Sequence, residues 1–260
     1  MKDGHIHTPV CPHGTDDKFE QYVEKAIKVG LDEISFTEHF PLPKGFTDPA
    51  PNNDSSIKLE QLKSYINDVN KLKDRYKDKI KINVGAEVDY VEGFEKEIKS
   101  LLDEYGKYLE DGILSVHMIK IKDEYYCMDF SSEEFEKIVN LLGSIESVYN
   151  LYYDTLIKAV NADLGEYKPK RIGHLNLVRK YNKKFPYDYS KNKKLEELVK
   201  LISEKEYELD YNVAGLFKED CGEVYISGYL AELIKKYNVK VVLGSDSHSS
   251  KFIDKYKINI

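Results

Sequence analysis

Short apolar runs alternate along the chain with longer segments in which apolar residues recur every three or four positions. The short runs are rich in β-branched residues and predict strands, whereas the longer segments predict amphipathic helices. The predicted strands cover residues 2–7, 33–38, 81–88, 112–117, 171–174, 207–212 and 239–245. Because a helix or a long loop follows each strand, the pattern indicates repeated βα units and a mainly parallel sheet.

Four of the intervening segments carry a clear apolar stripe of helical spacing. The stripes are Phe19, Val23, Ala26 and Ile27; Leu62, Ile66, Val69 and Leu72; Phe135, Ile138, Val139 and Leu142; and Leu195, Leu198, Val199 and Ile202. The third helix is expected to begin at Ser131, because Glu134 follows at the spacing of a capping box.

The length of the chain limits how these units assemble. Its 260 residues are long enough for a sizeable core, and seven βα units leave too few residues for a second domain. We therefore expect one α/β domain over residues 1–260. A seven- or eight-stranded barrel is the natural closure, and a doubly wound open sheet is the competing architecture.

The composition bears on which molecules the protein binds and in which compartment it works. A net charge of −7 argues against a general nucleic-acid or membrane-surface binder. The three cysteines, Cys11, Cys127 and Cys221, form no CxxC pair, which fits a reducing compartment. The polar N-terminus has no signal-peptide core, and no apolar run approaches membrane-spanning length. These features predict a cytoplasmic protein.

The seven histidines of the chain are not scattered relative to the predicted strands. They are His5, His7, His13, His39, His117, His174 and His248. His5 and His7 lie two apart on the first strand, a spacing that points both side chains to one face. The others, apart from His13 in the loop after the first strand, lie at strand ends, as do Glu87 and Asp246.

This distribution predicts a metal centre. A single histidine at a strand end is more often a satisfied polar residue, and an HxH pair alone is weak evidence. Six histidines and two carboxylates at one end of successive strands have no explanation in packing, and parallel barrels place their active sites at that end. Imidazole with carboxylate suits Zn²⁺, Fe²⁺ or Mn²⁺. The ligands exceed the needs of one ion, so several ions are implied.

The motifs around these ligands resemble those of the polymerase-and-histidinol-phosphatase (PHP) superfamily. The matching segments are Asp3-Gly-His-Ile-His7, Thr37-Glu-His39, Gly85-Ala-Glu87, Ser115-Val-His117, Gly173-His174 and Gly244-Ser-Asp-Ser-His248. The resemblance spans nearly the whole chain. It implies a distorted (β/α)7 barrel of PHP type that holds three divalent ions.

When each motif of the family is matched to this chain, the resemblance implies a set of ligands for each of the three ions. His5, His7, Glu87 and Asp246 would hold the first ion; Glu87, as a bridge, with His117 and His174 the second; and His13, His39 and His248 the third. Every histidine is then used, so Cys11 is expected to have a loop-packing role.

Four segments resemble more narrowly the histidinol-phosphate phosphatase branch of this superfamily. They are His7-Thr-Pro-Val-Cys-Pro-His-Gly14, Thr37-Glu-His-Phe-Pro-Leu-Pro43, Gly173-His-Leu-Asn-Leu-Val-Arg-Lys180 and Asn212-Val-Ala-Gly-Leu-Phe-Lys218. The last departs from the family pattern, which often carries Arg where this chain has Phe217. The branch hydrolyses L-histidinol phosphate to L-histidinol and phosphate in histidine biosynthesis, so a small phosphate monoester is the expected substrate.

The resemblance implies that Glu87 bridges two ions. Asp246 or His248 could provide the proton for the leaving alkoxide. Arg179 and Lys218 are expected to bind the phosphate, because both lie in loops past the ends of predicted strands, on the face of the active site. Arg171 is expected to face the helices, because it lies three residues before His174 and strand side chains alternate. The alternatives are a PHP phosphatase or phosphodiesterase for another phosphoester, and a PHP domain kept as a structural or metal-storage module.

Overall fold

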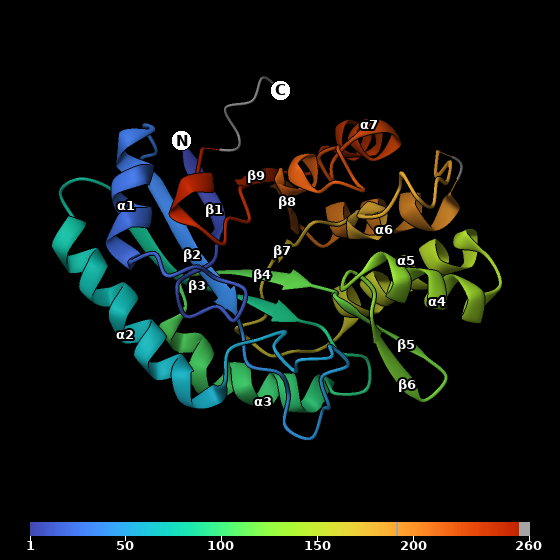
Figure 1. Cartoon of the computed structure of the whole chain (residues 1–260), viewed down its shortest axis with the longest axis horizontal. Coiled ribbons are helices and arrows are strands. Elements are labelled where there is room, and N and C mark those ends of the chain that lie inside the picture. Colours follow the sequence, from blue (N-terminus) through green and yellow to red (C-terminus); the bar gives the residue numbers. More distant parts are fainter. Residues whose placement is uncertain (191, 255–260) are drawn as a thin grey trace.

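In the computed structural model, seven parallel strands form the centre of the molecule and helices surround them (Figure 1). The structure describes residues 1–190 and 192–254. The strands run in the order of the chain around the sheet: β1 (Lys2–Ile6), β2 (Glu33–His39), β3 (Lys81–Asp89), β4 (Asp111–Ser115), β7 (Arg171–Ile172), β8 (Glu208–Asn212) and β9 (Val241–Gly244). All seven predicted strands are confirmed, with ends that differ by a few residues.

The sheet nearly closes on itself, which settles the choice between a barrel and an open sheet. Just past β9, Ser247 bridges to Ile6 of β1 in parallel register. The backbone N–H of His7 donates to the Ser247 carbonyl at 3.0 Å, and that of Asp246 donates to the His5 carbonyl at 2.8 Å. The (β/α)7 barrel is therefore confirmed, and this closure brings His5 and His7 together with Asp246 and His248.

The main helices lie outside the strands. They are α1 (Phe19–Lys28), α2 (Leu59–Tyr76), α3 (Glu95–Tyr105), α4 (Ser132–Leu142), α5 (Ile145–Asn161), α6 (Lys193–Glu204) and α7 (Gly228–Tyr237). Their apolar stripes form the core against the outer face of the strands; in α2, for example, Leu62, Val69 and Leu72 are buried. Ser131 caps α4 as predicted, since its hydroxyl accepts from the Glu134 N–H at 3.1 Å. Short 3-10 turns lie at Gly106–Tyr108, Leu177–Arg179, Ala214–Phe217 and Ser250–Phe252.

Two features were not predicted. An antiparallel hairpin of β5 (Met118–Ile121) and β6 (Glu124–Cys127) follows β4 and projects beside α4 and α5 (Figure 1). Helix α5 is the second feature: it buries one face, which includes Tyr149, Tyr152 and Tyr153, against the rest of the molecule. No helix within the described residues is long and apolar enough to cross a membrane.

The interior of the barrel below the histidines is polar, and it contains Arg171. The prediction that Arg171 faces the helices is wrong: its side chain is buried, donates to the Gly4 carbonyl at 2.7 Å and pairs with Asp111 at 3.1 Å. The alternation rule fails because β7 has only two residues and His174 takes a positive φ of 21°. That twist lets Arg171 and His174, three residues apart, both point inward.

Candidate metal centre

The predicted ligands converge at the carboxyl end of the barrel. Strands β1, β2 and β3 themselves carry His5, His39 and Glu87, whereas the remaining ligands lie one to four residues beyond β1, β4, β7 and β9: His7, His117, His174, Asp246 and His248. Most of these side chains are buried, and His248 is the most exposed of them at 30%. The parallel register thus places at one point side chains that are up to 243 residues apart in the sequence.

Glu87 lies at the centre of the group. Its Oε2 is 3.5 Å from His5 Nε2, 3.4 Å from His7 Nε2 and 3.2 Å from His39 Nδ1. Its other oxygen, Oε1, faces a different set, at 3.0 Å from His174 Nε2 and 3.8 Å from His117 Nε2. One carboxylate thus presents its two oxygens to two separate groups of imidazoles, which is the geometry of a bridging ligand.

Asp246 completes the group on the side of β1. Its Oδ1 lies 3.3 Å from His7 Nε2 and 3.7 Å from His5 Nε2. Asp246 has a positive φ of 51°, a conformation that costs a non-glycine residue free energy and is concentrated at functional sites. The two non-glycine residues of the centre with positive φ, Asp246 and His174, are both expected ligands.

The spacing of these atoms fits metal ions. Two ligand atoms that hold one ion at about 2.1 Å in a tetrahedron lie about 3.4 Å apart. The distances from Glu87 Oε2 to His5 and His7, and from Asp246 Oδ1 to His7, are 3.5, 3.4 and 3.3 Å. Imidazole and carboxylate together suit Zn²⁺, Fe²⁺ or Mn²⁺. By both distance and donor type, the residues present are suited to binding divalent ions.

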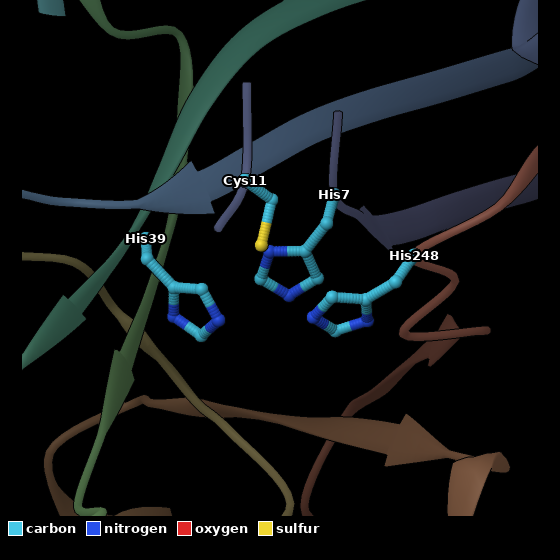
Figure 2. Close-up of side chains that lie close together, drawn as sticks. All are labelled: His7, Cys11, His39 and His248. Carbon is cyan, nitrogen blue, oxygen red and sulfur yellow. The ribbon is translucent and has the colours of Figure 1, made fainter. Parts of the chain in front are cut away.

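Three compact groups of donors can be distinguished, each with ligand atoms within 4.8 Å of one another. They are His5, His7 and Glu87; Glu87, His117 and His174; and His7, Cys11, His39 and His248. The third group, shown in Figure 2, contains Cys11 where His13 was expected. His13 lies at the rim with a half-exposed side chain, and its Nε2 is 3.7 Å from Asp54. Its ring centroid is 6.2 Å from that of His39 and 6.3 Å from that of His248.

A shell of carboxylates behind the histidines was missed by the sequence reasoning. Asp210 Oδ2 lies 2.7 Å from His5 Nδ1, Asp89 Oδ1 lies 2.8 Å from His117 Nδ1, and Glu38 Oε1 lies 3.4 Å from His7 Nδ1. Such partners fix the tautomer of a ligating imidazole, so that the opposite nitrogen is free to bind a metal. The sequence could have indicated these carboxylates, because each of them lies on a predicted strand or at its end, as the histidines do.

Glycine makes room for one of these pairs. A Cβ on Gly244 would lie 2.0 Å from Asp210 Oδ1 and 2.8 Å from the His5 Cβ. Any side chain at this position would push the Asp210–His5 pair apart. The Gly244-Ser-Asp-Ser-His248 motif therefore contributes space as well as ligands.

The electrostatics of the centre are dominated by its carboxylates. Burial opposes a positive charge on His5, but Asp210, Asp246 and Glu87 outweigh burial and raise its pKa to about 10. Burial also opposes ionisation of Glu87, yet the surrounding imidazoles, His5 foremost, hold its pKa well below the usual range. In contrast, burial and the neighbouring His7 lower the pKa of His248 to about 3. The centre therefore concentrates negative charge that requires cations beside it.

A cavity of about 550 Å³ opens over the centre. Besides the ligands it is lined by Asp129, Lys180, Lys218 and Tyr225. Lys180 Nζ lies 2.8 Å from Asp129 Oδ2 and also donates to the Asp129 carbonyl at 2.6 Å. Burial opposes the charge of Lys180, but Asp129 outweighs burial and raises its pKa. The cavity thus has two lysine side chains close to the ligands.

Arg179, the expected phosphate contact, does not line this cavity. Its guanidinium pairs with Glu223 and lies over the Tyr189 ring, with Cζ 4.4 Å from the ring centroid. The 3-10 turn Leu177–Arg179 directs the Arg179 side chain away from the centre and places Lys180 at the cavity. The structure thus brings Lys218 and Lys180 to the cavity, but not Arg179.

Comparison with known proteins agrees with this geometry. Residues 3–214 match the family model of the PHP domain. The chain is 44% identical to a histidinol-phosphatase of Bacillus subtilis, over 96% of this chain and 94% of that protein. A crystal structure from Listeria monocytogenes, assigned as a histidinol phosphatase, is 35% identical, with a TM-score of 0.95 over the whole of both chains.

A second solved structure carries ligands. It is the histidinol phosphate phosphatase of Lactococcus lactis in complex with zinc, L-histidinol and phosphate. That protein is 26% identical to this chain, with a TM-score of 0.70, over 96% of this chain and 86% of the other. With its barrel, its histidine cluster and these relatives, the chain belongs to the PHP-domain family, on the histidinol-phosphatase branch.

Proposed function

We propose that this protein is a metal-dependent histidinol-phosphatase, which hydrolyses L-histidinol phosphate to L-histidinol and phosphate in histidine biosynthesis. The observation that carries the proposal is the position of Glu87, whose two oxygens face two separate groups of histidines beneath an open cavity. The identity of 44% to a histidinol-phosphatase over nearly the full length supports the choice of substrate.

Three divalent ions, of Zn²⁺, Fe²⁺ or Mn²⁺, are proposed for the centre. His5, His7, Glu87 and Asp246 would hold the first, and Glu87, His117 and His174 the second. His39 and His248 would hold the third together with His13, whose ring centroid is 6.2 Å from that of His39 and 6.3 Å from that of His248. Divalent ions supply Lewis acidity and lower the pKa of a bound water to about 7. The protein contributes the fixed arrangement of ligands and the carboxylates that orient His5, His7 and His117.

Cations of the cavity wall would bind the phosphate. Lys180 Nζ is held by two contacts to Asp129, which leaves its third N–H for a ligand of the cavity. Lys218 lines the same cavity. A dianionic monoester gains more from this positive surface than a diester with one negative charge. The lysines therefore favour a phosphate monoester.

Proton transfer to the departing alkoxide is assigned to Asp246 or His248. Both line the cavity, and the Asp246 carboxylate lies 3.7 Å from His248 Nδ1. A group that gives its proton to the alkoxide oxygen as the P–O bond breaks removes the cost of expelling a charged leaving group. Glu87 acts differently, because it is buried beneath the imidazoles and serves to hold ions in position.

A phosphate-release assay tests the proposal. The metal-replete protein should hydrolyse L-histidinol phosphate with a kcat/KM far above that for p-nitrophenyl phosphate or a dinucleotide. Preference for the dinucleotide would instead identify a phosphodiesterase, and preference for another small monoester a different phosphatase. A metal-replete protein that is inert towards every phosphoester would favour a structural or storage module. We expect the enzyme to act in the cytoplasm, in keeping with its three free cysteines.

A further inference from the structure

Tyr225 lines the cavity over the metal centre, in the segment between the 3-10 turn Ala214–Phe217 and α7. We infer that its hydroxyl donates a hydrogen bond to the phosphoryl group of the substrate. The inference rests on the proposed phosphatase function and adds a neutral donor to the lysines of the cavity wall. The proton stays on the phenolic oxygen throughout, so Tyr225 binds the phosphoryl group and takes no part in proton transfer.

The tyrosine is buried beside an expected ligand of the second ion. Its ring lies nearly edge-on to that of His174, with the centroids 6.1 Å apart and the planes at 69°. His174 Nε2 is in turn 3.0 Å from Glu87 Oε1. Only 2% of Tyr225 is exposed, yet the residue lines the cavity. The part of Tyr225 that reaches the cavity is therefore small and lies deep, close to the expected ligands.

The hydroxyl of Tyr225 is available to a ligand. Buried tyrosine hydroxyls usually find a hydrogen-bond partner, and Tyr65 does so with the Phe36 and Gly85 carbonyls, at 2.8 Å each. The Tyr225 hydroxyl donates to no group within the described part of the chain. Because the residue borders the cavity and is otherwise enclosed, a molecule bound in the cavity is the acceptor that this O–H can reach.

The surrounding chain fixes the direction of this side chain. The Tyr225 N–H donates to the Asn212 carbonyl at 3.3 Å, at the end of β8. The Asn212 side chain donates to Asp246 Oδ2 at 3.1 Å, so the tyrosine and this expected ligand share one support. Gly215 makes room for the ring, since a Cβ there would lie 3.3 Å from Tyr225 Cζ, the carbon that carries the hydroxyl. A donor held in place in this way needs no reorganisation when the phosphoryl group binds.

The chemistry of the hydroxyl favours the phosphoryl group over the organic half of the substrate. Burial, with the carboxylates of Asp246 and Asp129 nearby, raises the pKa of Tyr225 well above its usual range, so the phenol acts as a donor. The oxygens of a phosphate dianion only accept hydrogen bonds, whereas the ammonium group of L-histidinol phosphate only donates them. The imidazole of the substrate could accept as well. It must lie nearer the opening of the cavity, because the phosphoryl group lies against the expected metal ligands at its floor.

Tyr225→Phe tests the inference, because it removes the hydroxyl and keeps the ring. Loss of one charge-assisted hydrogen bond should lower kcat/KM by roughly tenfold to a hundredfold, and by the same factor for L-histidinol phosphate and p-nitrophenyl phosphate. The inhibition constant of inorganic phosphate should rise by a similar factor, while metal content and the urea midpoint stay unchanged. Tyr207→Phe is the matched control, since its buried hydroxyl donates to the Val160 carbonyl away from this cavity. It should keep the kinetics, phosphate inhibition and metal content of the unmodified protein.

Three results would overturn the inference and leave the proposed function standing. A loss confined to L-histidinol phosphate, with unchanged inhibition by phosphate, would assign Tyr225 to the organic half of the substrate. Loss of bound metal in Tyr225→Phe would assign it to the support of His174. Unchanged kinetics and phosphate inhibition would assign it to packing alone.

A crystal structure of the unmodified, metal-loaded protein with inorganic phosphate needs no variant. It should place the Tyr225 hydroxyl within about 2.5–3.0 Å of a phosphate oxygen, and a hydroxyl that reaches no phosphate oxygen would overturn the inference. A metal-loaded protein that neither binds phosphate nor cleaves any phosphoester would overturn the proposed function and the inference together.

Discussion

Asp210 Oδ2 lies 2.7 Å from His5 Nδ1, on the side of the imidazole opposite to Glu87 and Asp246. Both residues are buried, and Asp210 also accepts from Asn212 Nδ2 at 3.0 Å. The carboxylate therefore fixes the ring so that Nε2 points into the centre, which makes Asp210 a positioning residue for a metal ligand.

Asp210→Asn should weaken the first site without removing a ligand. The amide keeps the size of the side chain but loses the charge that supports the His5 ring, so we expect about a 10–100-fold loss in affinity for one ion. Competition with a chelator measures this loss. Glu208→Gln, two residues earlier on β8, is the matched control and should keep the affinity of the unmodified protein. Equal affinities for both variants would refute the positioning role.

Glu87→Gln should be among the most damaging changes in the chain. An amide cannot supply two anionic oxygens to two groups of imidazoles, so metal content should fall by up to two ions and turnover should nearly vanish. His39→Asn should affect mainly the third ion. Elemental analysis with steady-state kinetics distinguishes these results. Full metal content with near-normal turnover in Glu87→Gln would mean that the carboxylate is not a bridge.

Lys180→Met should impair phosphate binding, while Arg179→Met should not. Lys180 lines the cavity, whereas Arg179 is occupied by Glu223 and Tyr189 outside it. A charge-assisted bond of about 1.5–3 kcal/mol, at about 1.4 kcal/mol per tenfold, gives a decrease of roughly tenfold to a hundredfold in kcat/KM for Lys180→Met. Metal content should stay unchanged in both variants. The opposite kinetic ranking would restore Arg179 as the phosphate contact.

Arg171→Met should destabilise the fold. The substitution removes a buried partner of Asp111, and breaking such a pair costs about 3–5 kcal/mol. We expect the lower end, because Lys2 Nζ remains 2.8 Å from Asp111. Urea unfolding measures the free energy. Arg75→Met, which removes an exposed pair with Glu20, is the control and should change it by less than about 1 kcal/mol. Similar losses in both variants would contradict the interior placement.

Removal of metal should abolish turnover reversibly. Protein purified without chelator should contain close to three divalent ions per chain, because the donors form three groups. Chelation should stop phosphate release, and Mn²⁺, Fe²⁺, Co²⁺ or Zn²⁺ should restore it to differing degrees. Elemental analysis that settles at one ion in a folded, active protein would contradict the three-ion centre.

The sequence by itself determined the strands and the place of the ligands. Strand periodicity is local, since alternation and β-branched content are properties of five to nine consecutive residues. Each of β1, β2 and β3 could therefore be located from its own residues. Parallel βα units then bring all carboxyl ends to one side, which is why His5, His39 and Glu87 were expected to meet.

Only the tertiary structure decided which neighbouring side chains face the centre. The alternation rule holds while the backbone stays extended, and the positive φ of His174 ends it, so Arg171 turned inward. The turn after β7 likewise places Lys180 at the cavity, where Arg179 was expected. The loop after β1 brought Cys11 into the third donor group and left His13 at the rim. These directions are set by contacts between segments far apart in the chain, such as Arg171 with Gly4, and no local pattern encodes them.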